Sequence, residues 1–470
     1  MKRQLSHLIK SSAVLMGLFL AGCYKYEERV WPQQIPEPGS GNPPAPIVTA
    51  PPKPSYIENG AIRVGVDLNM GGSITFLGLT GSGVNLINNY DTGRQIQASF
   101  YSGPVPYKPN GKEPHPYWYG LGWNPVQSGD YLGNRSKVLA FENDGRQMYI
   151  KTQPMIWPVI GEVADCHVET WITLENNTVK VRCKLTNFRS DTKQYPSTPQ
   201  ELPAVYTNGP YHIVTFYNGW KPFTNDTLST LQSPGTTTNF ISRENWVAMV
   251  NEQKWGLGVW KPDHYSFVTS SAGAAGRGGE YDVSTTSLAP FYYEILDHNI
   301  QYDYNYTLIV GSLSEIRQYA YAQPRPSKAP NYRFVADRQH WQYYGFATDA
   351  GWPINNELNV SLAQGNFLTS GPFVFWQASD IPKIYVRAAY NTEATHARLR
   401  WRITDDPEFL PDRILDFPII SDGQFHTYEL DMTKVPSWRS TIVGLGFEPA
   451  LGEKGGAGKF VKIQSITASQ

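Results

Sequence analysis

The sequence predicts an all-β protein with a large antiparallel β-sandwich and a second, smaller β module. Strand-like alternating runs such as AIRVGVDL, QMYIKT and TVKVRCKL recur between turns rich in Gly, Asn and Asp. The 41 glycines and 36 prolines among 470 residues favour many turns. We find no amphipathic helical pattern longer than about three turns and no repeat of fixed period, which argues against α-toroids, TIM barrels, propellers and solenoids.

The first 22 residues have the features of a secretory signal peptide. Lys2 and Arg3 precede a short apolar run at 13–21, too short to cross a bilayer core of about 30 Å as a helix. The run ends in Leu-Ala-Gly-Cys at 20–23, which resembles the bacterial lipobox. That resemblance implies that the Cys23 thiol is acylated and anchors the protein. The alternative is an ordinary secretory signal with an incidental cysteine.

The segment after Cys23 indicates where the protein works. Lys25-Tyr26-Glu27-Glu28 is similar to the acidic export tag of Bacteroidota surface lipoproteins, so we expect a location at the outer membrane or cell surface. Residues 31–54 are rich in Pro, and residues 23–56 are therefore interpreted as a linker, or as a leader without a role. The net charge of -1 gives no electrostatic basis for binding nucleic acid and no polybasic patch for a membrane surface. The N-terminal lipid would therefore be the only membrane contact.

Two further cysteines lie in a predicted hairpin. A turn at 176–177 places Cys183 opposite Thr170 and Cys166 opposite Asn187. The two thiols then share a buried face but lie too far apart for a disulfide. Two cysteines without clustered partners also do not make a zinc site, so we expect free, buried thiols.

The start of the large domain carries a resemblance to a known family. Gly71-Gly72-Ser73-Ile74-Thr75-Phe76-Leu77, followed by Asn85-Leu86-Ile87-Asn88, resembles the opening of galactose-mutarotase-like β-sandwiches. The resemblance covers about residues 57–322 and implies a sheet that carries a sugar-binding cleft. The family's usual catalytic histidine spacing is not found, so epimerase activity is not expected. Nucleotide-binding loops and the HExxH and GxSxG motifs are not found either.

A linker at 323–333 precedes the second module, 334–470. Three of its segments carry a resemblance to jelly-roll modules of the carbohydrate-binding type: 422–428 (DGQFHTY), 436–438 (PSW) and 444–449 (GLGFEP). Some such modules bind glycans and others only pack against their neighbour, and both alternatives are open. The resemblance also allows a structural Ca²⁺ ion in this module; otherwise we expect no cofactor and no metal.

Residues 88–101 form the first segment that concentrates functional groups. It contains Asp91, Arg94, Gln97 and Tyr101. In one interpretation Asp91 caps the turn and pairs with Arg94. In the other, Arg94 and Gln97 donate hydrogen bonds to sugar hydroxyls or to a uronate.

Residues 115–134 are the strongest candidate for a binding cleft. The segment has two tryptophans in a loop that contains glycine, with amides and a carboxylate nearby. The tryptophan rings could stack on a sugar ring while the amides and the carboxylate bond its hydroxyls. The alternative is a long packed loop. The candidate residues are His115, Trp118, Trp123, Asn124, Gln127 and Asp130.

Residues 195–214 contain four prolines and are interpreted as a stiffened loop that presents Glu201, Tyr206 and His212. A carboxyl group fixed among aromatic rings can have its pKa raised by desolvation and act as a general acid. The alternative is a solvated glutamate. Glu169, which faces Lys184 in the predicted hairpin, is interpreted as half of an ion pair and is only a reserve candidate.

These residues favour a monomeric glycoside hydrolase acting on a polysaccharide or oligosaccharide, with Glu201 and Asp130 as its catalytic carboxyls. Aromatic residues make up 13% of the chain, which suits sugar binding. We expect the three segments to meet over one sheet face. The first alternative is a polysaccharide lyase, and the second is a glycan-binding protein without activity. A lyase would neutralise a uronate and remove its C5 proton with groups drawn from Arg94, Gln127, Asn124, His212 and Tyr206.

Overall fold

The structure is a computed structural model that describes residues 53–232, 235, 237–262, 264–404 and 408–470. All of them belong to one compact unit, Pro38–Gln470. The expected signal peptide, the lipidation site Cys23 and most of the proline-rich linker lie outside the described residues. None of the helices in the described ranges has the length and apolar character needed to cross a membrane.

The chain enters the fold through a three-stranded sheet of β1 (Pro54–Glu58), β2 (Ile62–Asp67) and β3 (Ser73–Leu79). The first strand thus begins three residues before the expected domain start at 57. The turn before β3 requires glycine, because Gly71 has φ +59° and a Cβ there would lie 1.9 Å from the backbone oxygen of Gln127.

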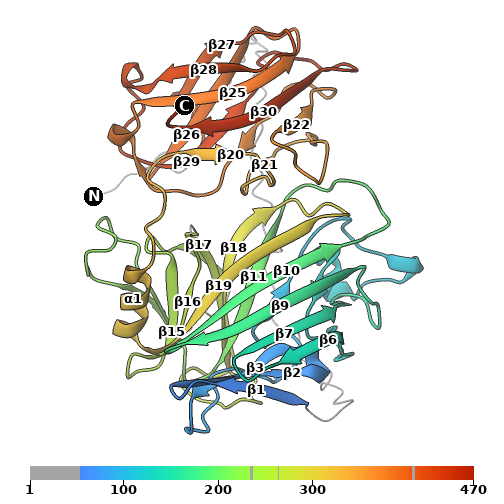
Figure 1. The fold of residues 1–470 in the computed structure, drawn as a ribbon, viewed down its shortest axis with the longest axis vertical. Coiled ribbons are helices and arrows are strands. Elements are labelled where there is room, and N and C mark those ends of the chain that lie inside the picture. Colours follow the sequence, from blue (N-terminus) through green and yellow to red (C-terminus); the bar gives the residue numbers. More distant parts are fainter. Residues whose placement is uncertain (1–52, 233–234, 236, 263, 405–407) are drawn as a thin grey trace, which may run out of the picture. The chain divides into compact units, whose positions relative to one another are not determined.

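Two larger antiparallel sheets form the predicted sandwich (Figure 1). The nine-stranded sheet has the order β13 (Ser229–Gln232), β12 (Ile213–Phe216), β15 (Trp246–Val250), β16 (Trp255–Trp260), β19 (Gln301–Ser312), β10 (Thr178–Asn187), β9 (Cys166–Glu175), β7 (Gln147–Gln153) and β6 (Lys137–Asn143). The seven-stranded sheet has the order β14 (Thr238–Ile241), β17 (Ser266–Ala272), β18 (Thr285–Glu294), β11 (Thr198–Asn208), β4 (Gln97–Ser99), β5 (Pro125–Val126) and β8 (Met155–Ile156).

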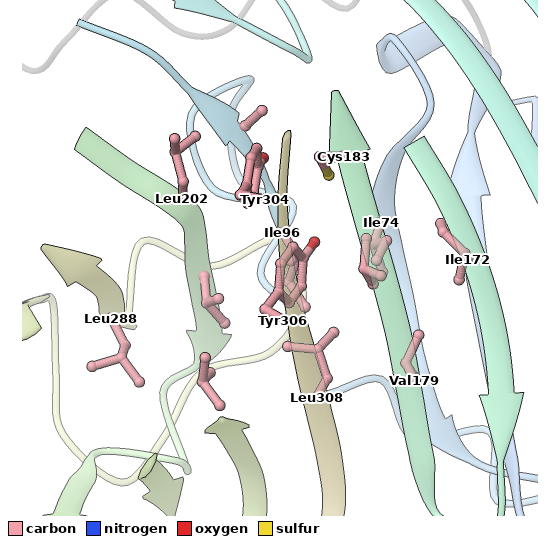
Figure 2. Packing of buried hydrophobic residues seen from close by; sticks show 14 of the residues in the cluster. Ile74, Ile96, Ile172, Val179, Cys183, Leu202, Leu288, Tyr304, Tyr306 and Leu308 are labelled. Carbon is pink, nitrogen blue, oxygen red and sulfur yellow. The ribbon is translucent and has the colours of Figure 1, made fainter. Parts of the chain in front are cut away.

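Alternate residues of both sheets meet in one hydrophobic core (Figure 2). Strand β10 contributes Val179 and Cys183 to this core, while Leu202 of β11 and Leu288 of β18 come from the opposite sheet. Their burial follows from the two-residue period of a strand, which sends every second side chain to the same face. The opposite faces of these strands remain available for a site.

The predicted register of the β9–β10 hairpin is confirmed. Cys183 pairs with Thr170 and Cys166 pairs with Asn187 across the ladder. Both cysteines are free and buried, as expected. Burial raises the pKa of the Cys183 thiol to about 11, so both the position and the chemistry of this thiol are those of a core side chain.

One α-helix, α1 (Leu313–Ala322), follows β19 in the described residues. Ser312 and Glu315 form a capping box at its start. Ile316 and Ala320 of the helix pack on the outer face of the nine-stranded sheet, against Ile309. The short 3₁₀ helices are η1 (Leu68–Met70), η2 (Pro109–Gly111), η3 (Pro116–Leu121), η4 (Ala378–Asp380) and η5 (Met432–Lys434).

The C-terminal module is a second antiparallel two-sheet sandwich with its own core. One sheet contains β20 (Asn331–Arg333), β30 (Phe460–Thr467), β25 (Lys383–Asn391) and β28 (His426–Asp431), with β22 (Leu358–Ser361) also on β30. The other contains β21 (Gln342–Tyr343), β23 (Thr369–Ser370), β29 (Thr441–Glu448), β26 (His396–Ile403) and β27 (Ile414–Pro418), with β24 (Trp376–Gln377) on β29. Trp438 of the PSW segment is a core residue, and its indole N–H donates to the backbone of Ala378 and Ile381.

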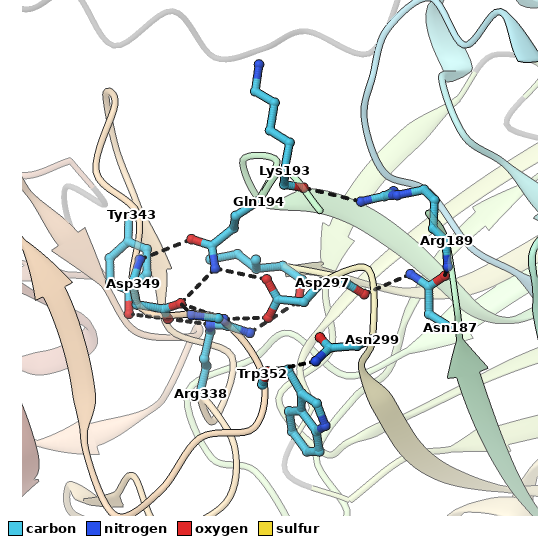
Figure 3. A network of polar contacts seen from close by, with 12 residues as sticks. Asn187, Arg189, Lys193, Gln194, Asp297, Asn299, Arg338, Tyr343, Asp349 and Trp352 are labelled. Atoms are coloured by element: carbon cyan, nitrogen blue, oxygen red, sulfur yellow. Dashed lines mark hydrogen bonds and ion pairs between the residues drawn. The ribbon is translucent and has the colours of Figure 1, made fainter. Parts of the chain in front are cut away.

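A buried ionic network joins the module to the large sandwich (Figure 3). Arg338 of the module donates to Asp297 of the sandwich at 2.6 Å and to Asp349 of the module at 2.6 Å. Gln194 of the sandwich donates to both of these carboxylates, at 2.9 and 2.7 Å. Nearby, His340 pairs with Glu294. The junction is therefore a specific, enclosed contact between the two domains.

Candidate functional site

Glu201 lies on the face of the seven-stranded sheet that points away from the core. It pairs with Ser99 of β4 on one side and Phe291 of β18 on the other. Its neighbour Leu202 points into the core, so the strand period directs Glu201 outward. The expected proline-stiffened loop is therefore wrong: these residues form strand β11, whose pairing register shifts between Glu201 and Val205.

The environment of Glu201 favours its protonated form. Burial raises the pKa of the Glu201 carboxyl, and a hydrogen bond from Tyr101 partly opposes the rise. Tyr101 donates this bond to Oε2 at 3.0 Å. The Glu201 side chain is nevertheless half-buried and not enclosed, so it remains accessible from the sheet face. A carboxyl with these properties can hold a proton and deliver it to a bound molecule.

Tyr206, on the same strand, connects Glu201 with the segment 88–101. Burial raises the pKa of the Tyr206 hydroxyl first, Glu201 raises it further, and Arg94 and Asp91 also act on it electrostatically. The backbone N–H of Asn88 donates to the Tyr206 carbonyl at 3.1 Å, which holds the segment against the strand. The structure thus brings four sequence-predicted residues together: Asp91, Arg94, Glu201 and Tyr206.

The pair Asp91–Arg94 forms one side of this site. Arg94 Nε lies 3.1 Å from Asp91 Oδ2, and the two side chains are 17% and 28% exposed, respectively. Arg94 also donates to the carbonyl of Val283 at 2.6 Å and lies over the ring of Tyr90. The turn is therefore ion-paired, and Asp91 also caps it by accepting from the Gly93 backbone N–H at 2.8 Å, as the first interpretation of this segment expects.

Two aromatic residues of β18 that the sequence analysis did not single out complete the sheet face. Phe291 pairs in register with Glu201, and Tyr293 lies two residues further along the strand. Their ring centroids are 6.0 Å apart in an edge-to-face arrangement. The two-residue period of a strand places residues 291 and 293 on one face and Tyr292 in the core, but the aromatic run FYYE does not itself alternate and so gave no signal.

The structure does not support Asp130 as a catalytic carboxyl. Its side chain is fully buried and accepts hydrogen bonds from the backbone N–H groups of Leu132, Asn134 and Gly161 at 2.8–3.0 Å, and from the Asn134 amide at 2.7 Å. With both oxygens occupied, the carboxylate organises its loop and cannot exchange a proton with a ligand. The loop does meet segment 88–101, since Thr92 donates to the Asp130 carbonyl.

The aromatic residues of segment 115–134 are divided between core and surface. Trp123 is completely buried, with Arg189 stacked on its ring, so it is not a platform for a ligand. Trp118 is half-buried and packs edge-on against Trp157. His115 is exposed and caps η3 by accepting from the Tyr117 backbone N–H. The alternative of a packed loop describes most of this segment.

The predicted amide ligands lie behind the site. Asn124 donates to Ser99 Oγ at 3.2 Å, and Ser99 is the residue of β4 that pairs with Glu201 across the ladder. Gln127 bonds the backbone of Ala98 and Gly71, and Gln97 bonds the backbone of Thr92 and Ser128. All three side chains are buried, so they hold the sheet and its loops in place and do not face a ligand.

The remaining two candidates lie elsewhere. His212 directly precedes strand β12 of the nine-stranded sheet, and its Nε2 lies 3.3 Å from Glu252 Oε1. Glu169 faces Lys184 in the predicted register, but its carboxylate accepts from the Tyr149 hydroxyl at 2.7 Å. Neither residue is brought to Glu201 by a contact of the described residues.

The described residues contain no group of three or more His, Cys, Asp or Glu side chains placed to hold a metal ion. In the C-terminal module the buried carboxylate of Glu453 is occupied by Thr392, Lys459 and backbone N–H groups. These contacts lower the pKa of Glu453 to about 2, with the Thr392 hydrogen bond as the largest cause. The Ca²⁺ expected from resemblance stays a prediction.

Comparison with solved structures returns galactose mutarotase-like proteins, but with low scores. A galactose mutarotase related enzyme from Lactobacillus acidophilus is 13% identical, with a TM-score of 0.34 over 55% of this chain and 98% of that one. A galactose mutarotase-like protein from Lactobacillus casei is 11% identical, with a TM-score of 0.36 over 55% and 100%. A 4-alpha-glucanotransferase from Thermococcus litoralis is 12% identical, with a TM-score of 0.31 over 56% and 40%.

No family model matches the sequence, and no curated protein matches it. The scores of the solved structures are too low to carry an argument about activity. The candidate site is therefore defined by this chain's own residues: the outer face of the seven-stranded sheet with half-buried Glu201 at its centre, the largely buried rings of Tyr101 and Phe291 beside it, and the Asp91–Arg94 pair at its edge.

Proposed function

We propose that the protein is a carbohydrate-active enzyme, a glycoside hydrolase in which Glu201 is the proton donor. The observation that carries the proposal is the raised pKa of a half-buried glutamate on an aromatic sheet face. Protonated Glu201 would donate to the glycosidic oxygen as the bond to the anomeric carbon breaks. The rings of Tyr101 and Phe291 would border the sugar, whose C–H faces pack well against aromatic rings.

Asp91 replaces Asp130 as the second carboxylate in this proposal. It is partly exposed, paired with Arg94, and close enough to Tyr206 to act on its hydroxyl, as Glu201 is. A carboxylate on the other side of the reacting centre would stabilise the developing positive charge or activate water. Arg94 holds Asp91 in place and would also contact sugar hydroxyls.

The hydrolase is favoured over the lyase by the tyrosines. Lyase chemistry would need a base to take a C5 proton, and Tyr206 is the candidate that lies at the site. Burial and the nearby Glu201 both raise the pKa of Tyr206, which opposes formation of the phenolate. A lyase would need Tyr206 to lose its proton, which its raised pKa opposes. A hydrolase needs Glu201 to keep its proton, which its raised pKa favours, so the ionisation of these groups suits the hydrolase better.

The cellular setting is part of the same proposal. Acylation of Cys23 would tether the enzyme to the outer membrane or cell surface, and the proline-rich segment would hold the folded body away from the lipid. An extracellular polysaccharide or oligosaccharide would then be the substrate. Metabolic labelling with a radioactive fatty acid, compared between wild type and Cys23→Ser, tests the anchor independently of the activity.

The activity is tested by screening soluble polysaccharides for new reducing ends. We expect wild type to release them and Glu201→Gln to lose at least about a hundredfold in rate, the usual contribution of a general acid. Glu142→Gln, at an exposed position on the other sheet, is the matched control. Products that absorb in the near ultraviolet would instead identify a lyase, and binding without turnover would identify a glycan-capturing protein. Unchanged activity of Glu201→Gln would remove Glu201 from the mechanism.

A further inference from the structure

A second surface with binding chemistry lies on the outer face of the nine-stranded sheet, away from Glu201. It is a shallow cavity of about 340 Å³, open to solvent, and its floor crosses strands β9, β10, β19 and β16. Its volume is at the lower end of the range for small-ligand sites, about 300–1,000 Å³. We call this surface the outer trough. None of its residues takes part in the mechanism proposed above.

Two aromatic walls border the outer trough. Trp260 and Tyr319 form one wall, with ring centroids 6.0 Å apart in an edge-to-face arrangement. Trp171 forms the other, and the guanidinium of Arg182 lies over its ring, 4.8 Å from the centroid. Both tryptophans are half-buried, so their rings reach the surface. Large rings at a solvent-exposed sheet face are a feature of surfaces that bind ligands.

The length of the outer trough follows from the strand pairing. Trp260 pairs with Thr307, Thr307 pairs with Lys180, and Lys180 pairs with Thr173. Three steps between neighbouring strands, each about 4.8 Å, make the trough about 14 Å long across the sheet. This length suits a short chain of linked rings better than a single small molecule.

The polar groups of the outer trough are mostly neutral. Thr173, Asn305 and Gln323 supply a hydroxyl and two amides along its floor and rim. The two cations are each compensated: Lys180 pairs with Glu175, and Arg182 pairs with Asp303 at 2.7 Å. Because these charges are already balanced, the surface has no excess charge for an anionic ligand, and its hydrogen-bonding groups match hydroxyls.

From this geometry we propose that the outer trough binds a neutral oligosaccharide segment of a glycan, separately from the Glu201 site. One sugar ring would pack against Trp260 and the remaining hydroxyls would bond the amides of Asn305 and Gln323. Such a site holds a polymer on the protein while another part of the same polymer reaches the sheet face that carries Glu201. Binding at the outer trough does not depend on catalysis at Glu201.

The test is affinity electrophoresis of the full-length chain in gels that contain β-glucan, xylan or galactomannan. The chain carries Glu201→Gln so that turnover does not alter the polymer. At least one of these neutral polymers should retard migration, and Trp260→Ala should weaken the apparent affinity about tenfold. Because Trp260 also packs against helix α1, the double variant Asn305→Ala/Gln323→Ala gives a second measurement at the rim. Trp220→Ala, at a 65% exposed tryptophan outside the trough, is the matched control.

Two results would overturn the proposal: no retardation by any of the three neutral polymers, or retardation that both sets of trough variants leave unchanged. Since the readout is migration of a variant that lacks Glu201, loss of the proposed hydrolase would not affect it. Conversely, a negative gel would leave the reducing-end assay of the Glu201 site intact.

Discussion

Replacing Arg338 by Met is expected to destabilise the protein strongly. Arg338 is 4% exposed, and the Asp297 and Asp349 side chains that it joins are 3% and 0% exposed. Methionine keeps much of the side-chain volume but removes all of the donors. Two carboxylates would then remain buried without their shared cation, a situation that costs far more than the intact pair contributes (Figure 3).

The magnitude follows from the class of the interaction. Removing one partner of a buried ion pair costs about 3–5 kcal/mol. The matched control is Arg398→Met in the same module: Arg398 pairs with Asp416, and these side chains are 24% and 41% exposed. Because exposed pairs contribute only about 0.2–1 kcal/mol, the control should change the free energy of unfolding very little.

Urea denaturation followed by tryptophan fluorescence measures the difference at pH 7. A second arm lowers the pH: although burial alone would raise the pKa of Asp349, the Arg338 hydrogen bond and charge outweigh it and lower that pKa. Wild type therefore keeps this contribution above a pH of about 4 and loses it as the pH falls further. In the Arg338→Met variant, protonation removes the buried charge, so the deficit should shrink in acid. A deficit below about 1 kcal/mol at pH 7, as in the control, would refute the reasoning.

Three further predictions concern single side chains. Glu294 raises the pKa of His340 against the effect of burial. This pair should therefore stabilise the fold below a pH of about 6.5 and lose that effect as the pH rises. The melting temperature of His340→Gln should be less sensitive to pH between about 6 and 8 than that of wild type. In a Cys23→Ser background, Ellman's reagent should label Cys166 and Cys183 only after unfolding, because burial raises both thiol pKa values; labelling of the native protein would contradict this. Asp130→Ala should cost about 2–4 kcal/mol in chemical denaturation, because four donors lose their acceptor, while the folded fraction keeps its activity; activity lost without a stability change would restore Asp130 as a catalytic candidate.

The strands of the β9–β10 hairpin and their register were predictable because the signal is local. Alternation in CHVETWITLE and TVKVRCKL, together with the turn at 176–177, was sufficient to give the pairing of Cys183 with Thr170. Each of these features depends on residues that are close in sequence, where strand periodicity and turn chemistry act directly.

The candidate site was only partly predictable, because side-chain direction is set by distant contacts. Glu201 and Asp130 both lie in segments that contain aromatic residues, and yet one faces the surface while the other caps a buried loop through Gly161. Whether a carboxylate is satisfied internally depends on which backbone N–H groups the fold delivers to it. Phe291 and Tyr293 were missed for a related reason, since an aromatic run gives no indication of which neighbour lies across the ladder.

The pH dependence of kcat/KM, compared between wild type and Tyr101→Phe, tests the role of Glu201 most directly. A general acid is active while protonated, so the rate should fall as the pH rises through its pKa. The Tyr101 hydrogen bond lowers the pKa of Glu201, and its removal should move that fall to higher pH. A descending limb that stays in place or moves to lower pH would contradict Glu201 as the proton donor.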